Sequence, residues 1–265
     1  FEQSHREQIG VSAYSLLGGV LPSTVNGSSN ITRQPWSQPG VFDALTGSVR
    51  FKQNLDNGWL WTTQYGTQRL RTDDRMGYAW GCGAEGNYNQ FCSNGTFDLY
   101  DFRSDNEKRL IETIQTGVSG KAVIAGIQNN LDFEIMRNRR LDRLPPAQAY
   151  NSVGPANIDG TVITPEDSRK TFANTDRTEY STELSAKDRI QINKNTSVWL
   201  GLRHIEFNRA SSQNAPADFN AVQYKNTINL PWVAVSQNLS KSTAIYASHG
   251  HGVEQFVVPN SGLYE

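Results

Sequence analysis

The 265-residue sequence has only two cysteines, two methionines and four histidines, and charged residues make up 19% of it. It contains no G-x-S-x-G, no H-E-x-x-H, no P-loop and no G-x-G-x-x-G motif opening a helix. The sequence therefore contains no motif of the common hydrolases, metalloproteases or nucleotide-binding enzymes. The formal net charge of -1 argues against a protein that binds the phosphate backbone of nucleic acids. We expect neither an enzyme nor a nucleic-acid-binding protein.

Long apolar runs are also missing. No stretch approaches the roughly 20 apolar residues that a membrane-spanning helix needs, which excludes a helical membrane protein. A transmembrane β-barrel is not excluded, because its strands face lipid only at every second position. The sequence begins at Phe1, shows no signal-peptide pattern, and ends at Glu265 just after the loop-like residues 259–262. We expect both ends to be cut and the sequence to be part of a longer chain.

Apolar residues recur at every second position along most of the chain, which is typical of strands with one apolar and one polar face. The clearest run combines Val123, Ala125, Ile127, Leu131, Phe133 and Ile135 with the intervening Gln128, Asn130, Asp132 and Glu134. This pattern predicts nine strands. They are expected at 1–9, 42–54, 59–73, 107–118, 123–140, 177–191, 197–209, 223–238 and 243–256.

The connections between these strands alternate between short and long. Short turns are expected at 54–58, 119–121, 193–195 and 239–241, and long loops at 10–41, 74–106, 141–176 and 210–222. Compact soluble domains rarely contain several loops of more than about 15 residues. An up-and-down outer-membrane barrel has short inner turns and long outer loops. The sequence therefore favours an all-β, antiparallel, up-and-down transmembrane β-barrel with long extracellular loops.

Aromatic residues near the predicted strand ends fit the same interpretation. Trp59, Trp61, Trp199 and Tyr246 follow short turns, where a barrel carries its interfacial aromatic girdle. The alternative is that these side chains pack in the core of a soluble sandwich. The barrel and sandwich interpretations make different predictions for these strands. In a barrel, Phe133 and its apolar neighbours face lipid and Glu134 faces the lumen. In a sandwich, a second sheet covers the apolar side chains.

Nine strands is an odd number, and bacterial single-chain barrels have even numbers of strands. The nine would leave two unpaired edges. We therefore expect a partial barrel, with the remaining strands missing from this sequence.

Four segments, in the same order, resemble the TonB-dependent siderophore receptors of the Gram-negative outer membrane. They are 34–39 (QPWSQP), 81–82 (GC) with 91–104 (FCSNGTFDLYDFRS), 200–203 (LGLR) and 244–252 (AIYASHGHG). Together they extend the resemblance over nearly the whole chain. It implies that residues 1–265 are about nine strands of a twenty-two-stranded barrel and that the plug domain and the C-terminal strands are absent.

The same resemblance implies the function of the complete protein. It would bind a ferric siderophore from outside and import it with energy supplied by TonB, so its role would be iron transport. The implied partners are the siderophore, TonB through the missing plug segment, and outer-membrane lipid or lipopolysaccharide. The implied location is the outer membrane of a Gram-negative cell.

Cys82 and Cys92 both lie in the long loop 74–106. A disulfide between them would close a loop of roughly ten residues and remove on the order of 3 kcal/mol of unfolded-chain entropy. It requires an oxidising compartment, such as the periplasm or the cell surface. The alternatives are two free thiols or half of a zinc site, and the spacer without a second cysteine pair or a nearby histidine disfavours zinc.

Aromatic and arginine side chains of the loops have the chemistry to bind a ferric siderophore. Aromatic rings offer flat apolar contact with a polar tip, and arginine offers planar donors to carboxylate or catecholate oxygens. The candidate ligand-binding residues are Trp36, Arg75, Tyr78, Trp80, Tyr100, Arg103 and Arg139. The alternative is that these aromatics pack the loops together and the arginines face solvent or lipopolysaccharide phosphates.

Neither a metal site nor a cofactor is expected. His249 and His251 share a strand face but lack a third ligand, and siderophores chelate iron themselves. Two other functions remain open. One is a secreted all-β surface binding protein or adhesin, which a glycan at Asn195 or Asn238 would support. The other is a TonB-dependent receptor for cobalamin, haem or a glycan.

Overall fold

The computed structural model of the protein describes residues 1–12, 30–213 and 222–253. The described residues form an eleven-stranded sheet in which all paired strands are antiparallel. The strands are β1 (Glu2–Ile9), β2 (Pro39–Asn54), β3 (Leu60–Ala79), β4 (Thr96–Ile124), β5 (Ile127–Arg143), β6 (Ala147–Asn157), β7 (Phe172–Ala173), β8 (Thr175–Asn193), β9 (Thr196–Gln213), β10 (Val222–Asn238) and β11 (Ala244–Gly250).

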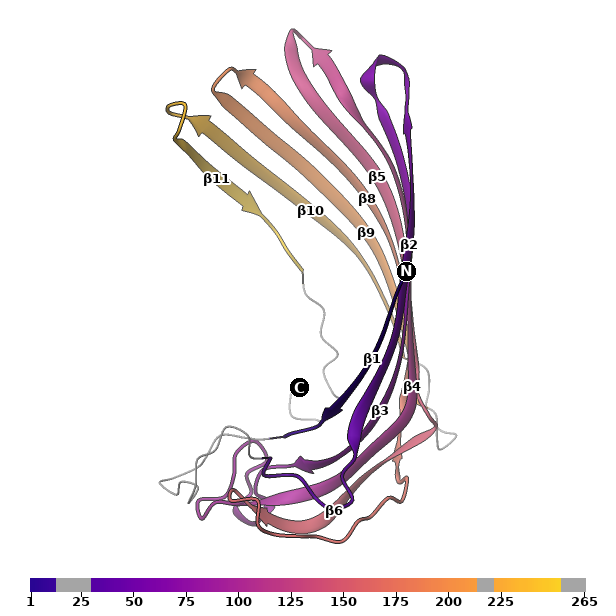
Figure 1. Ribbon diagram of the computed structural model, residues 1–265. Helices are drawn as coiled ribbons and strands as arrows, with labels where there is room; N and C mark the ends of the chain where they lie inside the picture. The colour runs from indigo at the N-terminus through magenta and orange to yellow at the C-terminus, as the bar shows by residue number, and fades with distance from the viewer. Residues whose placement is uncertain (13–29, 214–221, 254–265) are drawn as a thin grey trace.

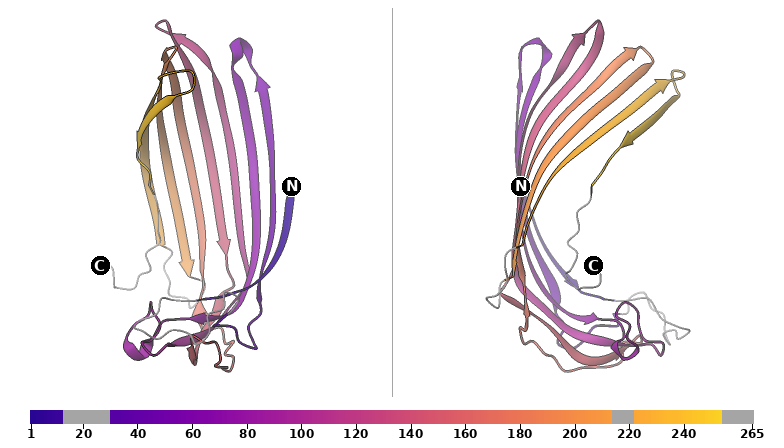
Figure 2. Two further views of the ribbon diagram at one scale, coloured as in Figure 1. Left: turned by 60° about the vertical axis from the view of Figure 1, so that its left-hand side comes forward. Right: turned by 180° about the vertical axis from the view of Figure 1, so that it is seen from behind.

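The main path of the sheet is β1-β2-β3-β4-β5-β8-β9-β10-β11, so nearly every strand pairs with its neighbour in the chain. β6 pairs with the outer end of β4, and β7 pairs with β6. The strands lie side by side as a curved wall with one concave and one convex face, and β1 and β11 do not meet (Figure 1, Figure 2). The expected all-β, up-and-down partial barrel is confirmed.

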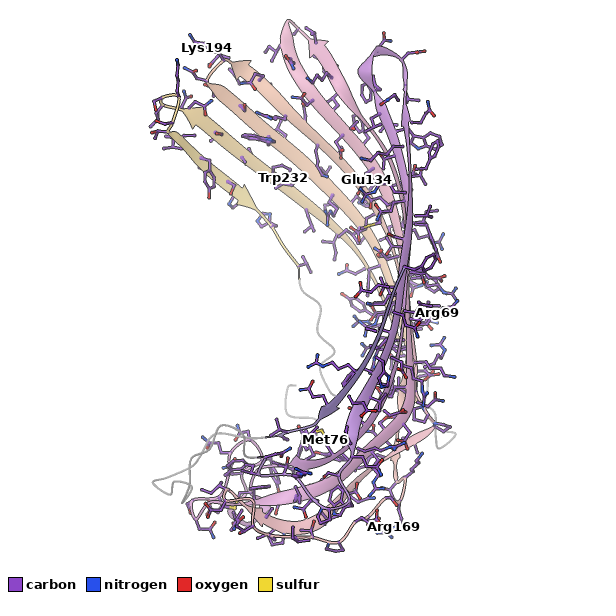
Figure 3. All side chains as sticks on the ribbon, in the orientation of Figure 1. Arg69, Met76, Glu134, Arg169, Lys194 and Trp232 are labelled. Carbon is purple, nitrogen blue, oxygen red and sulfur yellow. A yellow bond between two sulfur atoms is a disulfide. The ribbon has the colours of Figure 1, made fainter. Side chains whose placement is uncertain are left out.

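The two faces of the wall have the chemistry that the alternation predicts. Phe133 lies opposite Val118 on one side and Ala186 on the other, and all three share the convex face. Figure 3 shows Arg69 on the convex side and Glu134 on the concave side. Phe133 is 45% exposed, and no second sheet covers the convex face of the described wall. The apolar side chains are therefore free to contact a lipid phase, as a barrel requires and a sandwich does not.

One predicted hairpin is displaced. The sequence predicts a turn at 119–121, but β4 continues to Ile124 and the turn is Ala125–Gly126, where φ is 50° and 78°. Gly120 lies within β4, and the ring of Trp59 lies against it. The absence of a side chain at Gly120 leaves the space that this ring occupies. Because the strands join at this later turn, Val123 lies opposite Gln128 on the concave face, not on the apolar face as predicted.

The outer ends of the strands also extend beyond the prediction. β3 runs to Ala79 and β4 starts at Thr96, so both enter the region expected to be the loop 74–106. β6 and β7 lie within the expected loop 141–176. The turns at 54–58, 193–195 and 239–241 occur as predicted. The predicted strand 243–256 is observed as β11, and residues 254–256 lie outside the described part, as do 13–29 of the first long loop and 214–221 of the last.

A β-bulge marks the place where the wall bends. The pairing of β3 with β4 shifts between Thr72 and Asp74, and Asn106 adopts a φ of 61°. The Asn106 backbone N–H donates to Asp73 Oδ1 over 2.5 Å, which satisfies a group that the ladder leaves unpaired. Beyond this point β3 and β4 curve toward the concave side of the wall (Figure 1).

The two described helices are single 3-10 turns of three residues each, Asp56–Gly58 and Gly83–Glu85, and neither approaches the length or apolarity of a membrane-spanning helix.

Candidate functional site

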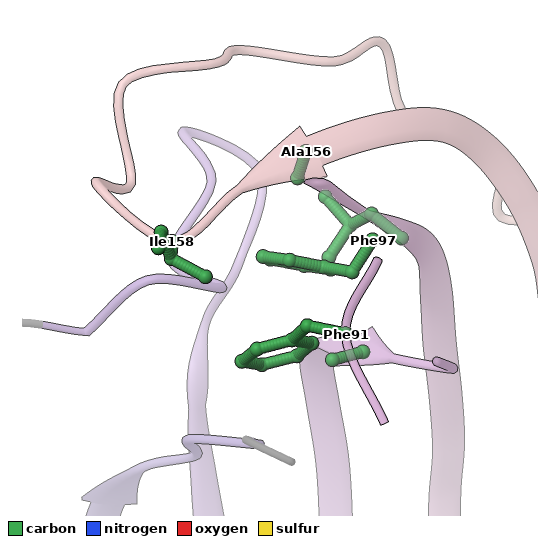
Figure 4. Packing of buried hydrophobic residues seen from close by; sticks show 6 residues of the cluster. Phe91, Phe97, Ala156 and Ile158 are labelled. Carbon is green, nitrogen blue, oxygen red and sulfur yellow. The ribbon is translucent and has the colours of Figure 1, made fainter. Parts of the chain in front are cut away.

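The bent outer part of the structure is a folded unit, which we call the loop lobe: residues 30–38, 74–106 and 144–174. It contains a small apolar core of its own (Figure 4). Phe91 stacks on Phe97 with ring centroids 4.8 Å apart, and Leu99 is fully buried beside them. Ala79, Ala156 and Ile158 complete this core. The side chains on the lobe surface are therefore held by a packed scaffold.

The ladder between β3 and β4 assigns the side chains of the lobe to two faces. Directly opposite pairs share a face, and successive pairs alternate between faces. One face carries the pairs Met76 with Phe102 and Tyr78 with Tyr100. The other face carries Arg75 with Arg103, Gly77 with Asp101, and Ala79 with Leu99. Aromatic candidates and arginine candidates are thus separated by the thickness of the sheet.

Six aromatic rings gather on the first of these faces. The ring of Tyr150, on β6, is central, with its centroid 4.9 Å from that of Tyr100 and 5.7 Å from that of Trp80. It also contacts Tyr78 at 5.8 Å and Phe172 at 5.7 Å. We call this cluster the aromatic patch; it consists of Tyr78, Trp80, Tyr100, Phe102, Tyr150 and Phe172.

The aromatic patch is accessible and faces the concave side. Figure 3 shows Met76 on the concave side of the bend, and Met76 shares its face with Phe102. Five of the rings are half-buried and Phe172 is 54% exposed. Burial raises the pKa of Tyr100, with a further contribution from the negative charge of Asp98. At neutral pH the Tyr100 hydroxyl is therefore protonated, and the patch combines apolar ring faces with a hydrogen-bond donor.

The opposite face of the lobe carries a hydrogen-bonded charge cluster. Asp101 is fully buried and accepts two hydrogen bonds from the Arg103 guanidinium, at 2.8 and 2.9 Å. The backbone N–H of Asp167 donates to the same carboxylate at 2.9 Å, and Arg103 also donates to Glu166 at 2.6 Å. The hydrogen bonds to Asp101 raise the pKa of Arg103. Arg103 and Asp101 therefore hold residues 166–167 against β4, and three of the five N–H groups of Arg103 are used in these contacts.

Trp36 also contacts the segment 158–171 that Arg103 holds. Its indole N–H donates to the carbonyl of Thr164 at 3.0 Å, and the Arg103 guanidinium lies 5.8 Å from its ring centroid. Two residues earlier, the Gln34 amide donates to the Val162 carbonyl at 3.0 Å and accepts from the Thr164 N–H at 2.9 Å. The QPWSQP segment thus joins residues 30–38 to residues 158–171.

The remaining arginine candidates lie away from the aromatic patch. Arg75 donates to Asp105 at 2.7 Å and to the Gln38 amide oxygen, on the face of the lobe that carries Arg103. Arg139 lies in the wall on the convex face of β5, where it faces Glu112 at 3.4 Å. Of the seven candidates, the structure therefore brings Tyr78, Trp80 and Tyr100 together.

Cys82 and Cys92 form a disulfide with a Cα–Cα distance of 5.0 Å, and both are buried. The disulfide closes the segment that precedes Phe97, at the edge of the apolar core. Glu85, between the two cysteines, accepts hydrogen bonds from the Ser93 hydroxyl and backbone N–H, which lower the pKa of its carboxyl group. The loop is therefore fixed by covalent and polar contacts together.

Sequence reasoning missed half of the aromatic patch. Phe102 follows Tyr100 by two residues, so strand periodicity would have placed the two rings together had β4 been predicted to extend this far. Tyr150 and Phe172 lie in the expected loop 141–176, where no strand was predicted. Their contribution depends on the pairing of β6 with β4, which has no local sequence signal.

No family model matches the sequence, and no curated protein is similar to it in sequence. Solved structures are similar in fold. The ferric-catecholate import receptor Fiu of Escherichia coli K12 has a TM-score of 0.68 at 15% identity, with 94% of this chain and 39% of Fiu covered.

Two structures from Acinetobacter baumannii are similar in the same way. The siderophore receptor PiuA has a TM-score of 0.72 at 12% identity over 94% of this chain and 38% of its own. The ferric preacinetobactin receptor BauA has a TM-score of 0.66 at 13% identity over 91% and 34%. All three of these proteins are receptors. The expected resemblance to TonB-dependent siderophore receptors is confirmed for the fold: the chain folds as part of their barrel and spans less than two fifths of the length of the structures named here.

Proposed function

We propose that the chain is part of an outer-membrane receptor that binds a ferric siderophore on the aromatic patch and imports it with energy supplied through TonB. The observation that carries the proposal is the position of the patch. Six rings lie on the concave face of a curved wall whose fold is that of ferric siderophore receptors. A ligand that enters from the loop side would meet the patch before it enters the lumen.

The chemistry of the patch suits an iron complex with an organic shell. Flat aromatic faces contact the rings and chain atoms of such a shell, and offset or edge contacts add specificity. The protonated Tyr100 hydroxyl can donate to an anionic oxygen of the complex. Iron is the cargo and stays chelated by the siderophore, so the protein needs no iron ligands of its own.

The partners follow from the same proposal. The convex apolar face would contact the hydrocarbon of the outer membrane, and the charged outer end of the wall its headgroups. TonB would act through a plug segment that lies outside this sequence. The arginine candidates Arg75 and Arg103 would contribute by holding the lobe in place, since both already bind carboxylates.

The experiment uses the complete receptor that contains this chain, purified in detergent. Binding of an iron(III) tris-catecholate complex and of ferric citrate is measured by calorimetry for the wild type, Tyr150→Ala and Tyr150→Phe. Loss of a central aromatic ring typically costs a binding site 2 kcal/mol or more, which is roughly a thirtyfold rise in Kd. We expect that rise for Tyr150→Ala with the complex that the wild type binds.

Tyr150→Phe keeps the ring and is expected to stay within about threefold of the wild type, because the stacking contacts remain. Circular dichroism checks that both variants keep the barrel. Unchanged affinity of a folded Tyr150→Ala receptor would show that the ligand binds elsewhere, and a wild type that binds neither complex would count against the receptor proposal for these two ligand classes.

A further inference from the structure

The aromatic patch has a carboxylate at its outer end. Asp98 precedes Tyr100 by two residues on β4, so the two side chains share the concave face. The Trp80 backbone N–H donates to the Asp98 carbonyl at 2.9 Å and continues the ladder between β3 and β4, which places Trp80 opposite Asp98. Burial, and then the charge of Asp98, raises the pKa of Tyr100. The carboxylate therefore lies beside Trp80 and Tyr100.

This carboxylate has no cationic partner. Its Oδ2 atom accepts the backbone N–H of Gly83 at 2.7 Å, and within the described residues no lysine, arginine or histidine nitrogen lies within 4.0 Å of it. A methyl group built on Gly83 would lie 2.8 Å from Asp98 Oδ2 and 3.9 Å from the ring of Tyr88. Asp98 is half-buried and Tyr88 is 58% exposed. The negative charge is therefore held among aromatic side chains and is open to a ligand.

The basic residues of the loop lobe do not compensate this charge. Four of the five lie within 4.0 Å of other carboxylates: Arg75, Arg103, Arg169 and Lys170. The fifth, Arg33, belongs to residues 30–38, which lie against the face opposite the patch at Gly77. Nearly all of the positive charge of the lobe is thus compensated, and the charge of Asp98 is not.

Basic residues beyond the lobe are also occupied or distant. On the concave side of the wall, Arg109 and Arg140 each have a carboxylate partner. The cation–π contacts of the described residues do not involve Trp80 or Tyr100; they are Arg103 with Trp36, Arg189 with Trp199, and Arg209 with Phe207. Residues 13–29, 214–221 and 254–265 contain no lysine, arginine or histidine. An anionic ligand on the patch would therefore meet Asp98 without a matching cation from this chain.

Ferric siderophore complexes differ in charge according to their chelating groups. A hydroxamate carries a single negative charge and a catecholate a double one, so three hydroxamates neutralise iron(III) whereas three catecholates leave the complex strongly anionic. A carboxylate beside the ligand repels an anionic complex. The ring faces of tryptophan and tyrosine attract a cation, as does a carboxylate. Asp98, Trp80 and Tyr100 thus have the chemistry to hold an ammonium group.

We propose that the aromatic patch is selective for an iron(III) trihydroxamate that carries a free ammonium group, and that it disfavours anionic tris-catecholate complexes. The ammonium group would donate to Asp98 and lie against the rings of Trp80 and Tyr100, and the neutral iron centre with its organic shell would contact the other rings of the patch. The inference rests on the proposed siderophore function and adds the charge and the chelating group of the ligand.

The test uses the complete receptor in detergent and measures by calorimetry the binding of three ferric complexes. They are a linear iron(III) trihydroxamate with a terminal ammonium group, the same complex with that amine acetylated, and an iron(III) tris-catecholate. The variant is Asp98→Asn, whose amide oxygen can still accept the Gly83 N–H. Glu85→Gln is the matched control, because it removes one negative charge from the same disulfide-closed loop and keeps an acceptor for the Ser93 N–H.

We expect the wild type to bind the ammonium-bearing trihydroxamate about fivefold more tightly than the acetylated one, the upper range for a solvent-accessible charge pair. It should bind the tris-catecholate more weakly than both. Asp98→Asn should lose the preference for the ammonium group, bind the acetylated complex like the wild type, and bind the tris-catecholate more tightly than the wild type does. Glu85→Gln should keep the wild-type preferences.

Three results would overturn the inference. The first is tighter binding of the tris-catecholate than of either trihydroxamate by the wild type. The second is an equal preference for the ammonium group in the wild type and Asp98→Asn, and the third is an equal loss of both trihydroxamates in Asp98→Asn. Tris-catecholate binding that Tyr150→Ala abolishes would leave the siderophore proposal standing without this inference, whereas a receptor that binds none of the three complexes would count against both.

Discussion

Glycine at position 77 allows residues 30–38 to lie against β3. A methyl group on Gly77 would overlap the backbone carbonyl oxygen of Thr32. Thr32 is fully buried, and its hydroxyl and N–H both bind the Asn30 side chain. The overlapping atom thus belongs to a backbone held in place by its own contacts. A side chain at position 77 cannot be accommodated by a simple change of rotamer.

We therefore predict that Gly77→Ala in the complete receptor displaces residues 30–38 and destabilises the loop lobe by about 1–3 kcal/mol, the range observed when a well-packed site is overfilled. Hydrogen exchange in residues 30–38 and 160–167 should become faster. Gly66→Ala is the matched control, because the atom nearest to its added methyl group is 4.0 Å away. Equal exchange in the two variants would mean that the contact at Gly77 does not hold the segment.

At the level of single residues, the sequence predicts which residues contribute to the site better than it predicts the face of the sheet on which each residue lies. Tyr78 and Tyr100 lie together as their strands require, but Arg103 and Arg109 lie on opposite faces of β4 although their numbers differ by an even amount. The cause is the extra residue of the bulge near Asn106, which reverses the alternation from there outward. No residue pattern marks this bulge, so only the observed register shows that the aromatic patch faces the concave side and Arg103 the convex side.

At the level of elements, the disulfide joins the two ends of the segment between β3 and β4. Removing it with Cys82→Ser/Cys92→Ser restores roughly 3 kcal/mol of chain entropy to the open loop. We predict that this double variant keeps its barrel but is cleaved between residues 83 and 95 by a protease that leaves the oxidised wild type intact. Reduction of the wild type with dithiothreitol should produce the same cleavage. A loop that stays resistant in the variant would show that the apolar core around Phe91 and Phe97 is sufficient to hold it.

Elements with strong alternation were predicted correctly, and those with weak alternation were not. β8 and β9 appear close to their predicted bounds because each has one apolar face, whereas β5 begins at Ile127 and not at the predicted residue 123. β6 has the sequence AQAYNSVGPAN, in which glycine, proline and asparagine resemble a loop. It is a strand because the outer end of β4 provides a pairing partner, with Phe102 opposite Tyr150. Such pairing is set by tertiary structure and cannot be obtained from local propensity.

At the scale of the whole molecule, the described sheet exposes a large apolar face and two strand edges. Val49, Phe51, Leu184 and Val233 are each more than 40% exposed on the convex side. We predict that the 265-residue chain, prepared alone in buffer without detergent, aggregates and shows no cooperative thermal transition, since exposed edges and apolar surface promote association. Circular dichroism and light scattering check this. A reversible, monomeric transition would contradict the assignment of the convex face to lipid.

The architecture of the wall could be predicted because it repeats one rule. Alternating residues with short turns between them give an up-and-down sheet, and each strand pairs with its chain neighbour. The loop lobe obeys no such rule. It combines residues 30–38 with residues 158–171 through Gln34 and Trp36, across more than 120 positions of the chain. Contacts of that range leave no periodic signal in the sequence.

β3 and β4 run from the wall into the loop lobe as single strands of 20 and 29 residues, and their pairing resumes directly after the bulge between Thr72 and Asp74. A ladder of this kind cannot hinge unless several adjacent backbone hydrogen bonds break at once. The aromatic patch is therefore rigidly attached to the wall, because most of its rings belong to β3, β4 and the strand β6 that pairs with β4. Under the proposed receptor function, the patch would therefore meet a ferric complex as a preformed surface, without a hinge movement of its own strands.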